Sequence, residues 1–340
     1  MLDILETVEQ WLSSNRKIAL ATVVQTWGSA PRGVGSKMAV TDDMAMVGSV
    51  SGGCVETAVI EEALESLQDR KPRLLTFGVS DDTAWDVGLT CGGRISVFVE
   101  PLDKQWWPIA AAAVRDNQIA ATVTVLEGDD AGQKAVFAAD GTIEYTTPDL
   151  TPDQQTAFAQ VAQSQLQSGR ATAAEQAVMV DVHQPRPHLI IIGGVHVAMP
   201  LQMFARAVGF RVSVIDPRQV FATPERFPEV ETILHSYPDK ALTQLGLDKN
   251  TYVTVLTHDP KIDDKALITA LPSAVPYVGV LSSQRTHQQR LERLAEAGLT
   301  HEQMSRIRTP IGLNIGAKTP EEIALCILAE IVAVRNGAIQ

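Results

Sequence analysis

The alternation of apolar and polar positions predicts short strands in the first part of the chain. The near-continuous apolar run Ile18–Val24 indicates a buried strand, and the segment from Lys37 to Val47 indicates a hairpin that turns at Thr41-Asp42-Asp43. Further strands are expected at Leu74–Phe77 and Ile95–Val99. Short strands of this kind, separated by glycine-bearing loops, predict a sheet that is combined with helices.

Helices are expected among these strands. Met1 to Ser14 carries apolar residues at helical spacing, and a second helix follows Cys54 directly. The polar, glutamine-rich segment Thr151–Ser168 is also helical in pattern and could connect two domains. The proline-broken stretch His183–Pro187 predicts the domain boundary, so residues 1–184 are expected to form an N-terminal mixed α/β (α+β) domain.

After this boundary strands alternate with helices, which is typical of a parallel sheet. Gly193-Gly194 opens a helix over about His196–Val208, and Thr319 begins a final helix in which Glu322 completes a capping box. Residues 185–340 are therefore expected to form a Rossmann-like domain, and the fold class is α/β. The expected strands of this domain are Leu189–Ile192, Arg211–Ile215, Tyr252–Leu256 and Tyr277–Leu281.

Composition and charge narrow the classes of function. The 340 residues are 45% hydrophobic and 20% charged, as in a folded globular protein, and the net charge is −12. No nucleic-acid partner is expected, because no basic patch offsets this charge. No membrane association is expected either, because no segment approaches the roughly 18 consecutive apolar residues of a bilayer span and the acidic N-terminal segment is unlike a signal peptide. Three cysteines, an odd number, favour a reducing, cytoplasmic location over a disulfide framework.

Cys54 is the first candidate for chemistry. It ends the loop Gly48–Cys54 where a helix begins, and the free N–H groups and dipole of a helix start favour the nucleophilic or metal-binding thiolate. Gly52 and Gly53 before it would let the backbone approach a ligand closely. The alternative is a small buried residue under a turn, and both interpretations remain open.

Cys91 lies in a second glycine loop, followed by Gly92 and Gly93. Two soft thiolates near loop amides would suit a sulfur-rich, phosphate-bearing ligand, so Cys54 and Cys91 are the candidate catalytic residues. Both loops could instead be turns only, or the two thiols could form a reversible disulfide in a redox sensor. No CxxC or histidine spacing indicates a zinc site, and no metal ligand is proposed.

Arg32 is a third candidate, because it lies in the proline- and glycine-bearing loop Gly28–Gly35. Its guanidinium could bind a phosphate or carboxylate through two parallel hydrogen bonds. A solvated loop arginine is the commoner role for such a residue.

The second domain carries part of a dinucleotide-binding fingerprint. Gly193-Gly194 follows a strand, His196 opens a helix, and Asp216 ends the next strand where the ribose-binding acid is expected. An NAD(P)-dependent oxidoreductase is therefore an alternative function. Val195 weakens it, because this position of the fingerprint needs glycine for the backbone to approach a pyrophosphate.

Several motifs follow one another in the order of a known family. Gly48–Glu56 reads GSVSGGCVE, Gly28 to Lys37 forms a loop of GSxPRxxGxxM type, and Cys91-Gly92-Gly93 forms a CGG loop. Together these resemble the XdhC/CoxI family, the accessory factors of xanthine dehydrogenase and related molybdenum hydroxylases. The second part adds Asp216-Pro217-Arg218, Thr257-His258-Asp259 with Asp263, Pro310–Leu313 and Thr319–Ala324. The chain departs from the family at Val195, where glycine is common, and at Leu281–Thr286, where a GSRRT-like stretch is common.

This resemblance implies a maturation factor that works as a chaperone more than as an enzyme. Such a factor binds molybdenum cofactor (molybdopterin), holds it while a terminal sulfido ligand is installed, and inserts it into an apo molybdenum hydroxylase. A cysteine desulfurase is implied as a second partner, and a homodimer is a further option. The candidate cofactor-binding residues are Arg32, Ser51, Gly52, Gly53, Cys54, Glu56, Cys91, Gly92, Gly93, Gly193, Gly194, His196 and Asp216.

Overall fold

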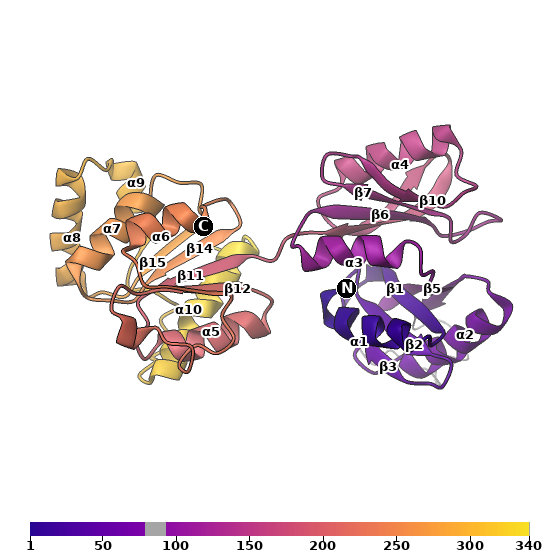
Figure 1. Cartoon of the computed structure of the whole chain (residues 1–340), viewed down its shortest axis with the longest axis horizontal. Helices are drawn as coiled ribbons and strands as arrows, with labels where there is room; N and C mark the ends of the chain where they lie inside the picture. The colour runs from indigo at the N-terminus through magenta and orange to yellow at the C-terminus, as the bar shows by residue number, and fades with distance from the viewer. Residues whose placement is uncertain (79–92, 340) are drawn as a thin grey trace. The chain divides into compact units, whose positions relative to one another are not determined.

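The computed structural model describes residues 1–78 and 93–339. The chain divides into two compact units, Met1–Pro185 (unit 1) and Arg186–Gln340 (unit 2). Unit 1 combines antiparallel sheets with helices, whereas unit 2 is built on a parallel sheet, so the fold class is α/β (Figure 1). The five tryptophans of the sequence fall within unit 1: Trp11, Trp27, Trp85, Trp106 and Trp107.

The first sheet of unit 1 has the strand order β3-β2-β1-β5-β4, with antiparallel pairing throughout. Its strands are β1 (Ile18–Trp27), β2 (Lys37–Thr41), β3 (Met46–Gly48), β4 (Arg73–Phe77) and β5 (Arg94–Pro101), and its helices are α1 (Leu2–Ser13) and α2 (Glu56–Asp69). Ala19 and Ala21 of β1 pack with α2, whereas Ile18 and Leu20 pack with α1. The run of apolar residues in β1 therefore reflects burial on both faces. The predicted strands, hairpin and two helices are confirmed.

A second antiparallel sheet of unit 1 has the order β8-β7-β6-β10-β9. Its strands are β6 (Ala120–Val125), β7 (Lys134–Ala138), β8 (Ile143–Thr146), β9 (Gly169–Ala173) and β10 (Gln176–His183), and its helices are α3 (Trp107–Arg115) and α4 (Pro152–Ser164). The glutamine-rich segment forms a helix as predicted, α4, but this helix does not connect the two units. Phe158 and Ala162 of α4 are buried in the core of this sheet, and β9 and β10 follow it within the same unit.

A buried ion pair joins the two sheets of unit 1. Nζ of Lys134 on β7 lies 2.6 Å from each carboxylate oxygen of Glu100 on β5. The same Nζ lies 4.4 Å from the centre of the Trp106 ring. The side chains of Lys134 and Glu100 are only 3% and 11% exposed, so removal of either partner would leave a buried charge without compensation.

Unit 2 contains a six-stranded sheet in the order β13-β12-β11-β14-β15-β16, with parallel pairing throughout. The strands are β11 (His188–Ile192), β12 (Arg211–Ile215), β13 (Thr232–Leu234), β14 (Thr251–Val255), β15 (Tyr277–Val280) and β16 (Ile307–Arg308). The chain runs outward from β11 to β13 and then returns to β14 on the other side of β11. This reversal is the topological switch point at which open α/β sheets bind ligands. The predicted Rossmann-like architecture is confirmed.

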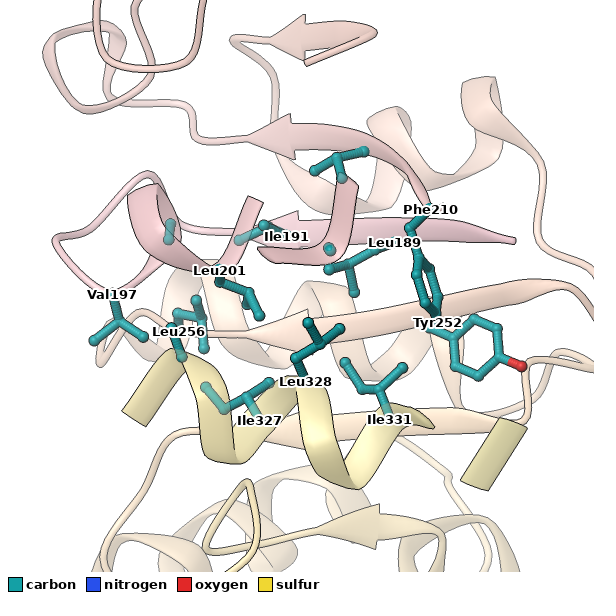
Figure 2. Packing of buried hydrophobic residues seen from close by; sticks show 14 of the residues in the cluster. Leu189, Ile191, Val197, Leu201, Phe210, Tyr252, Leu256, Ile327, Leu328 and Ile331 are labelled. Atoms are coloured by element: carbon teal, nitrogen blue, oxygen red, sulfur yellow. The ribbon is translucent and has the colours of Figure 1, made fainter. Parts of the chain in front are cut away.

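Helices cover both faces of this sheet. They are α5 (Ala198–Ala207), α6 (Pro238–Leu245), α7 (Pro260–Ala270), α8 (Gln284–Glu296), α9 (His301–Ser305) and α10 (Pro320–Arg335). Leu189 and Ile191 of β11 share a hydrophobic cluster with residues of α5 and α10, and Figure 2 labels Leu201 of α5 and Ile327 of α10 in this cluster. Ile190 and Ile192 pack with α6, α7 and α8 on the opposite face. The helix predicted from about His196 begins two residues later, and the predicted capping box of the last helix is confirmed.

Candidate functional site

Two glycine-bearing loops predicted from the sequence, Gly28–Gly35 and Gly48–Cys54, meet in unit 1, and Gly93 of the third loop lies against the first of them. Nε of Arg32 donates to the carbonyl oxygen of Ser49 at 3.2 Å, and this hydrogen bond joins the loop Gly28–Gly35 to the loop Gly48–Cys54. The backbone of Gly93 lies so close to the first loop that a Cβ on it would come within 2.5 Å of the carbonyl oxygen of Ser29. The predicted site residues Cys91 and Gly92 lie outside the described residues. The loop of Arg32 therefore contacts both the Cys54 loop and the last residue of the CGG loop.

The loop Gly48–Cys54 is folded around the carboxylate of Glu56. Oε1 accepts from the Ser49 hydroxyl at 2.7 Å and from the Ser51 amide at 2.9 Å. Oε2 accepts from the Gly53 amide at 2.9 Å and from the Ser51 hydroxyl. Glu56 is the first residue of α2, and its carboxylate also accepts from the amide of Val55 at 3.2 Å. The positive end of α2 thus already has an internal anion.

These hydrogen bonds set the protonation state of Glu56. Burial by itself would raise the pKa of the carboxyl, but the Ser51 and Ser49 hydroxyls and the loop amides outweigh burial and lower the pKa to about 2. Glu56 is therefore ionised at neutral pH and fixes the loop from inside.

The loop amides expected to face a ligand already have acceptors. The N–H of Gly52 donates to Ser49 Oγ, that of Gly53 to Glu56, and that of Cys54 to Ser51 Oγ, each at 2.9 Å. An amide carries one proton to donate, so a phosphate could reach these groups only by displacing the side chains. The geometry therefore argues against a phosphate cradle built from these amides.

Cys54 lies half-buried at the edge of the core under α2. Its thiol is free. Gly52 and Gly53 have φ values of +78° and +112°, a backbone conformation that favours glycine. Cys54 follows these two glycines and lies one residue before Val55, the N-cap of α2, so the helix itself begins two residues after Cys54. Whether Cys54 and Cys91 lie together remains a prediction.

Arg32 lies beside this loop at the surface of unit 1. Its Nη2 donates to Oδ2 of Asp3 at 3.0 Å, and its side chain is 37% exposed. Arg32 and Asp3 line a cavity of about 280 Å³ that also contacts Asp181. In unit 1 the carboxylate of Asp181 accepts from the buried Nζ of Lys37 at 2.8 Å. Arg32 keeps an exposed guanidinium edge, so binding of an anion there remains a prediction.

In unit 2 a cleft of about 630 Å³ lies where the strand order reverses. It collects residues that follow the carboxyl ends of β11, β12, β14 and β15, as expected for ligand sites in this fold. His196 and His258 are exposed at this cleft, and the half-buried Val195 belongs to its wall. The lining residues are Val195, His196, Val197, Arg218, Leu256, Thr257, His258, Asp259, Pro260 and Leu281.

Asp216, the predicted ribose-binding acid, is fully buried and has no acceptor position left. Its Oδ1 accepts from the backbone N–H and the Nε of Arg218, both at 2.9 Å. Its Oδ2 accepts from Nη2 of Arg218 at 2.8 Å and from the amide of Gly194 at 3.0 Å. A carboxylate offers about four acceptor positions, and all of them are used here. Asp216 could bind a ribose only if its hydrogen bonds to Arg218 were broken, so this geometry argues against Asp216 as a ribose-binding acid.

Gly194 has a packing role in this structure. A Cβ on it would come within 2.4 Å of the carbonyl oxygen of Phe221, in the short 3-10 helix Gln219–Phe221. Gly193 is similarly crowded by Thr257. Close packing therefore requires glycine at both positions, whether or not a ligand approaches them.

A buried charged pair lies next to the cleft. The carboxylate of Asp263 accepts from the Thr257 hydroxyl and, at 3.0 Å, from Nη2 of Arg290. Burial raises the pKa of Asp263 and outweighs the opposing effects of Thr257 and Arg290. The sequence motif points to Asp263 but not to Arg290, because an arginine on a charged helix such as α8 gives no sign that it is buried.

Sequence reasoning missed the role of Arg218 and of Phe221. The guanidinium carbon of Arg218 lies 4.1 Å from the centre of the Phe221 ring. The motif Asp216-Pro217-Arg218 held the signal, since a proline between two oppositely charged residues limits the ways in which they can face each other.

The described residues include neither a membrane-spanning helix nor a cluster of metal ligands. No helix there combines the length and apolarity needed to cross a bilayer. Within residues 1–78 and 93–339, no group of three or more His, Cys, Asp or Glu side chains is arranged to hold a metal ion.

Three curated relatives align with nearly the whole chain. The uncharacterized protein YqeB of Escherichia coli is 29% identical over 325 residues, which is 95% of this chain but 44% of YqeB. A Bacillus subtilis protein, named as a probable xanthine dehydrogenase subunit, is 26% identical over 96% of this chain and 95% of its own length. The molybdenum cofactor insertion chaperone PaoD of Escherichia coli is 28% identical over 98% of this chain and 88% of its own length. The chain thus spans less than half of YqeB and most of the other two.

Comparison with solved structures and family models agrees with these relatives. A crystal structure described as a xanthine dehydrogenase from Bacillus halodurans matches with a TM-score of 0.81 and 24% identity, over 99% of this chain and 96% of that chain. This likeness shows the fold. The model of the XdhC Rossmann domain matches residues 189–331, and the model of the XdhC and CoxI family matches residues 11–78. The chain belongs to the XdhC and CoxI family.

Proposed function

We propose that this protein binds molybdenum cofactor and delivers it to a molybdenum hydroxylase of the xanthine dehydrogenase type. The observation that carries the proposal is the similarity to PaoD, a molybdenum cofactor insertion chaperone, over 98% of this chain. The relative from Bacillus subtilis, whose name refers to xanthine dehydrogenase, supports the class of recipient enzyme. In this proposal residues 1–184 hold the cofactor, and residues 185–340 form the second domain.

The proposed cofactor contact is the place where the loops Gly28–Gly35 and Gly48–Cys54 meet in unit 1, beside Gly93. Cys54 offers a thiol at this place, and Arg32 offers a guanidinium edge that is bonded to the same loop. Glu56 and Ser51 act indirectly, because they fix the loop that carries Cys54. Cys91, with Gly92 and Gly93, is proposed as the second thiol-bearing contact, since Gly93 packs against the first loop.

The finer steps of this function are part of the same proposal. A thiol at this place would shield the terminal sulfur of the bound cofactor, and a sulfur donor such as a cysteine desulfurase would supply that sulfur. Soft thiolates are suitable partners for such a metal–sulfur group. Assembly as a homodimer is likewise a proposal.

An NAD(P)-dependent oxidoreductase is less well supported. The ribose-binding position at Asp216 is filled by Arg218, and Val195 stands where a pyrophosphate needs glycine. We therefore do not propose hydride transfer as the function of unit 2.

Anaerobic binding tests the main proposal. Purified protein is mixed with reduced molybdenum cofactor, separated by gel filtration, and the protein fraction is assayed for pterin and molybdenum. Stoichiometric retention is expected, with lower retention in Cys54→Ala and in Cys91→Ala. Cys326→Ala is the matched control, because Cys326 is buried in α10 of unit 2 and should not affect retention.

Two results would contradict the proposal at different levels. If the parent protein retains no cofactor, the chaperone function is wrong. If it retains the cofactor and both thiol variants do so equally well, the function stands and the thiol contacts are wrong.

A further inference from the structure

We propose that the cleft of unit 2 binds a nucleotide-sized ligand through a phosphate monoester held by Arg218. This site lies outside the proposed thiol contacts of unit 1. The inference does not depend on the proposed function and stands or falls on binding at the cleft alone. It starts from the cavity of about 630 Å³ at the switch point of the parallel sheet, a size suited to a small organic ligand.

The first step is that the acid usually available to a ribose is occupied. All four acceptor positions of Asp216 receive N–H groups, three of them from Arg218. A ligand that needs a free carboxylate after the second strand for its 2′- and 3′-hydroxyls, such as NAD, finds none at the position of Asp216. The charge that this position presents to the cleft is therefore the guanidinium and not the carboxylate.

The second step is that Arg218 is held in place with part of its guanidinium unused. Asp216 binds Nε and Nη2 on one edge, and the Phe221 ring lies 4.1 Å below the guanidinium carbon. Within the described part of the chain, Nη1 makes no hydrogen bond. The side chain is 37% exposed and belongs to the cleft lining. A fixed guanidinium with an unused edge is suited to phosphate.

The third step concerns the other charges at the cleft. Asp259 is the one carboxylate among the lining residues, and its Oδ1 caps α7 by accepting from the amide of Lys261 at 2.9 Å. His196 and His258 are exposed at the same cleft and can donate hydrogen bonds to an anion. Asp259 opposes an anion, so its removal should strengthen the binding of a phosphate that lies in this cleft.

The fourth step limits the ligand. In folds of this topology the second strand ends beside the ribose, and an arginine there accommodates a 2′-phosphate. Val195 crowds the place of a dinucleotide pyrophosphate. A mononucleotide with a phosphate monoester therefore fits these restrictions better than NAD does, while the apolar residues Val197, Leu256 and Leu281 offer a surface for the base.

Calorimetric titration of the full chain tests this inference with ligands that differ by one phosphate. Adenosine, adenosine 2′-monophosphate, adenosine 5′-monophosphate and NAD are compared. At least one monophosphate should bind at least about tenfold more tightly than adenosine, because hydrogen bonds to a charged group contribute about that much. NAD should bind no more tightly than adenosine. Equal affinity of adenosine and both monophosphates, or no binding by any of them, would overturn the inference.

Two substitutions with opposite expected effects locate the phosphate. Arg218→Met should remove the preference for the monophosphate. Asp259→Asn keeps a good helix cap, and should lower the Kd of the monophosphate at least about twofold without changing that of adenosine. Arg218→Met leaves the buried Asp216 without its partner and can therefore fail to fold. In that case Asp259→Asn alone tests whether the phosphate lies in this cleft. A preference that neither substitution alters would place the phosphate elsewhere and overturn the assignment.

The phosphate monoester could belong to a free nucleotide or to molybdenum cofactor itself. Retention of reduced cofactor by Asp259→Asn and Arg218→Met, measured by gel filtration, distinguishes the two sources. Altered retention in these variants would identify the phosphate end of the cofactor as the occupant. Retention like that of the parent, together with a changed affinity for the mononucleotide, would identify a free nucleotide.

Discussion

In each unit a buried carboxylate accepts hydrogen bonds from N–H groups close to it in the sequence. Glu56 accepts hydrogen bonds from the loop that precedes it, and Asp216 accepts them from Arg218 and from the amide of Gly194. In both cases an internal anion takes the N–H groups that the sequence pattern offers to an external one. Residue types alone cannot reveal this, because the outcome depends on whether a nearby carboxylate can fold back onto its own loop.

Glu56 should make the unfolding free energy of unit 1 decrease at acidic pH. Its pKa falls from 4.5 to about 2 on folding, so the stabilisation is complete above about pH 4.5 and is lost as the pH falls toward 2. The shift corresponds to about 3 kcal/mol. The difference in unfolding free energy between the parent and Glu56→Gln should therefore shrink between pH 6 and about pH 2.5.

The exposed Glu61 on the same helix supplies the control for this test. Glu61→Gln should change the unfolding free energy by less than about 0.5 kcal/mol at any of these pH values. A Glu56→Gln effect as small as that of Glu61→Gln would show that the carboxylate does not hold the loop.

His188 should produce a second pH dependence, in unit 2. Its imidazole is buried at the start of β11, with Nε2 2.8 Å from Ser213 Oγ. Burial, and then the nearby charge of Arg211, lower its pKa from 6.5 to about 4. The unfolded state therefore binds more protons between these values, so stability is complete above about pH 6.5 and declines as the pH falls toward 4.

The variant His188→Gln isolates this contribution, because glutamine can still bond to Ser213 and has no proton to gain. Chemical denaturation at several pH values should show a decline of about 3 kcal/mol for the parent that is absent from the variant. Parallel declines in the two proteins would assign the pH dependence to other groups.

At the scale of elements, some strands and hydrogen bonds depend on packing between layers, which the local pattern of apolar residues does not reveal. The strands β1, β11 and β12 were predictable because their apolar runs are buried on both faces, and the cap of α10 was predictable from Thr319 and Glu322. The strands β9 and β10 were not predicted, since β9 has no continuous apolar run and the run Ala177–Val180 of β10 is too short for its pattern alone to distinguish a strand from a helical segment. The loops of the candidate site were foreseen as loops, whereas their internal hydrogen bonds were not.

The pair Lys134 and Glu100 should couple the two sheets of unit 1. Lys134→Met leaves the carboxylate of Glu100 buried without a counter-charge, which costs about 3–5 kcal/mol of unfolding free energy. The double variant Lys134→Met with Glu100→Leu removes both charges and should be considerably more stable than Lys134→Met alone. Chemical denaturation of the parent, both single variants and the double variant measures this coupling. Additive effects of the two substitutions would show that the sheets do not depend on the pair.

At the scale of the whole molecule, each unit has hydrophobic clusters of its own. The tryptophans fall in the sequence of unit 1, whereas Tyr237, Tyr252 and Tyr277 fall in unit 2. Tryptophan fluorescence should therefore report the unfolding of unit 1, and tyrosine absorbance mainly that of unit 2. His188→Gln should change the unfolding monitored through tyrosine and leave the tryptophan transition in place. A tryptophan transition that moves equally would mean that the two units unfold together.

The sheet of unit 2 also affects how molecules of this protein behave toward one another. Its two outer strands are the shortest of the sheet: β13 has three residues and β16 has two. An edge strand exposes unpaired backbone groups that can template pairing with another chain, and short edges offer few of them. Edge-to-edge aggregation through this sheet is therefore disfavoured.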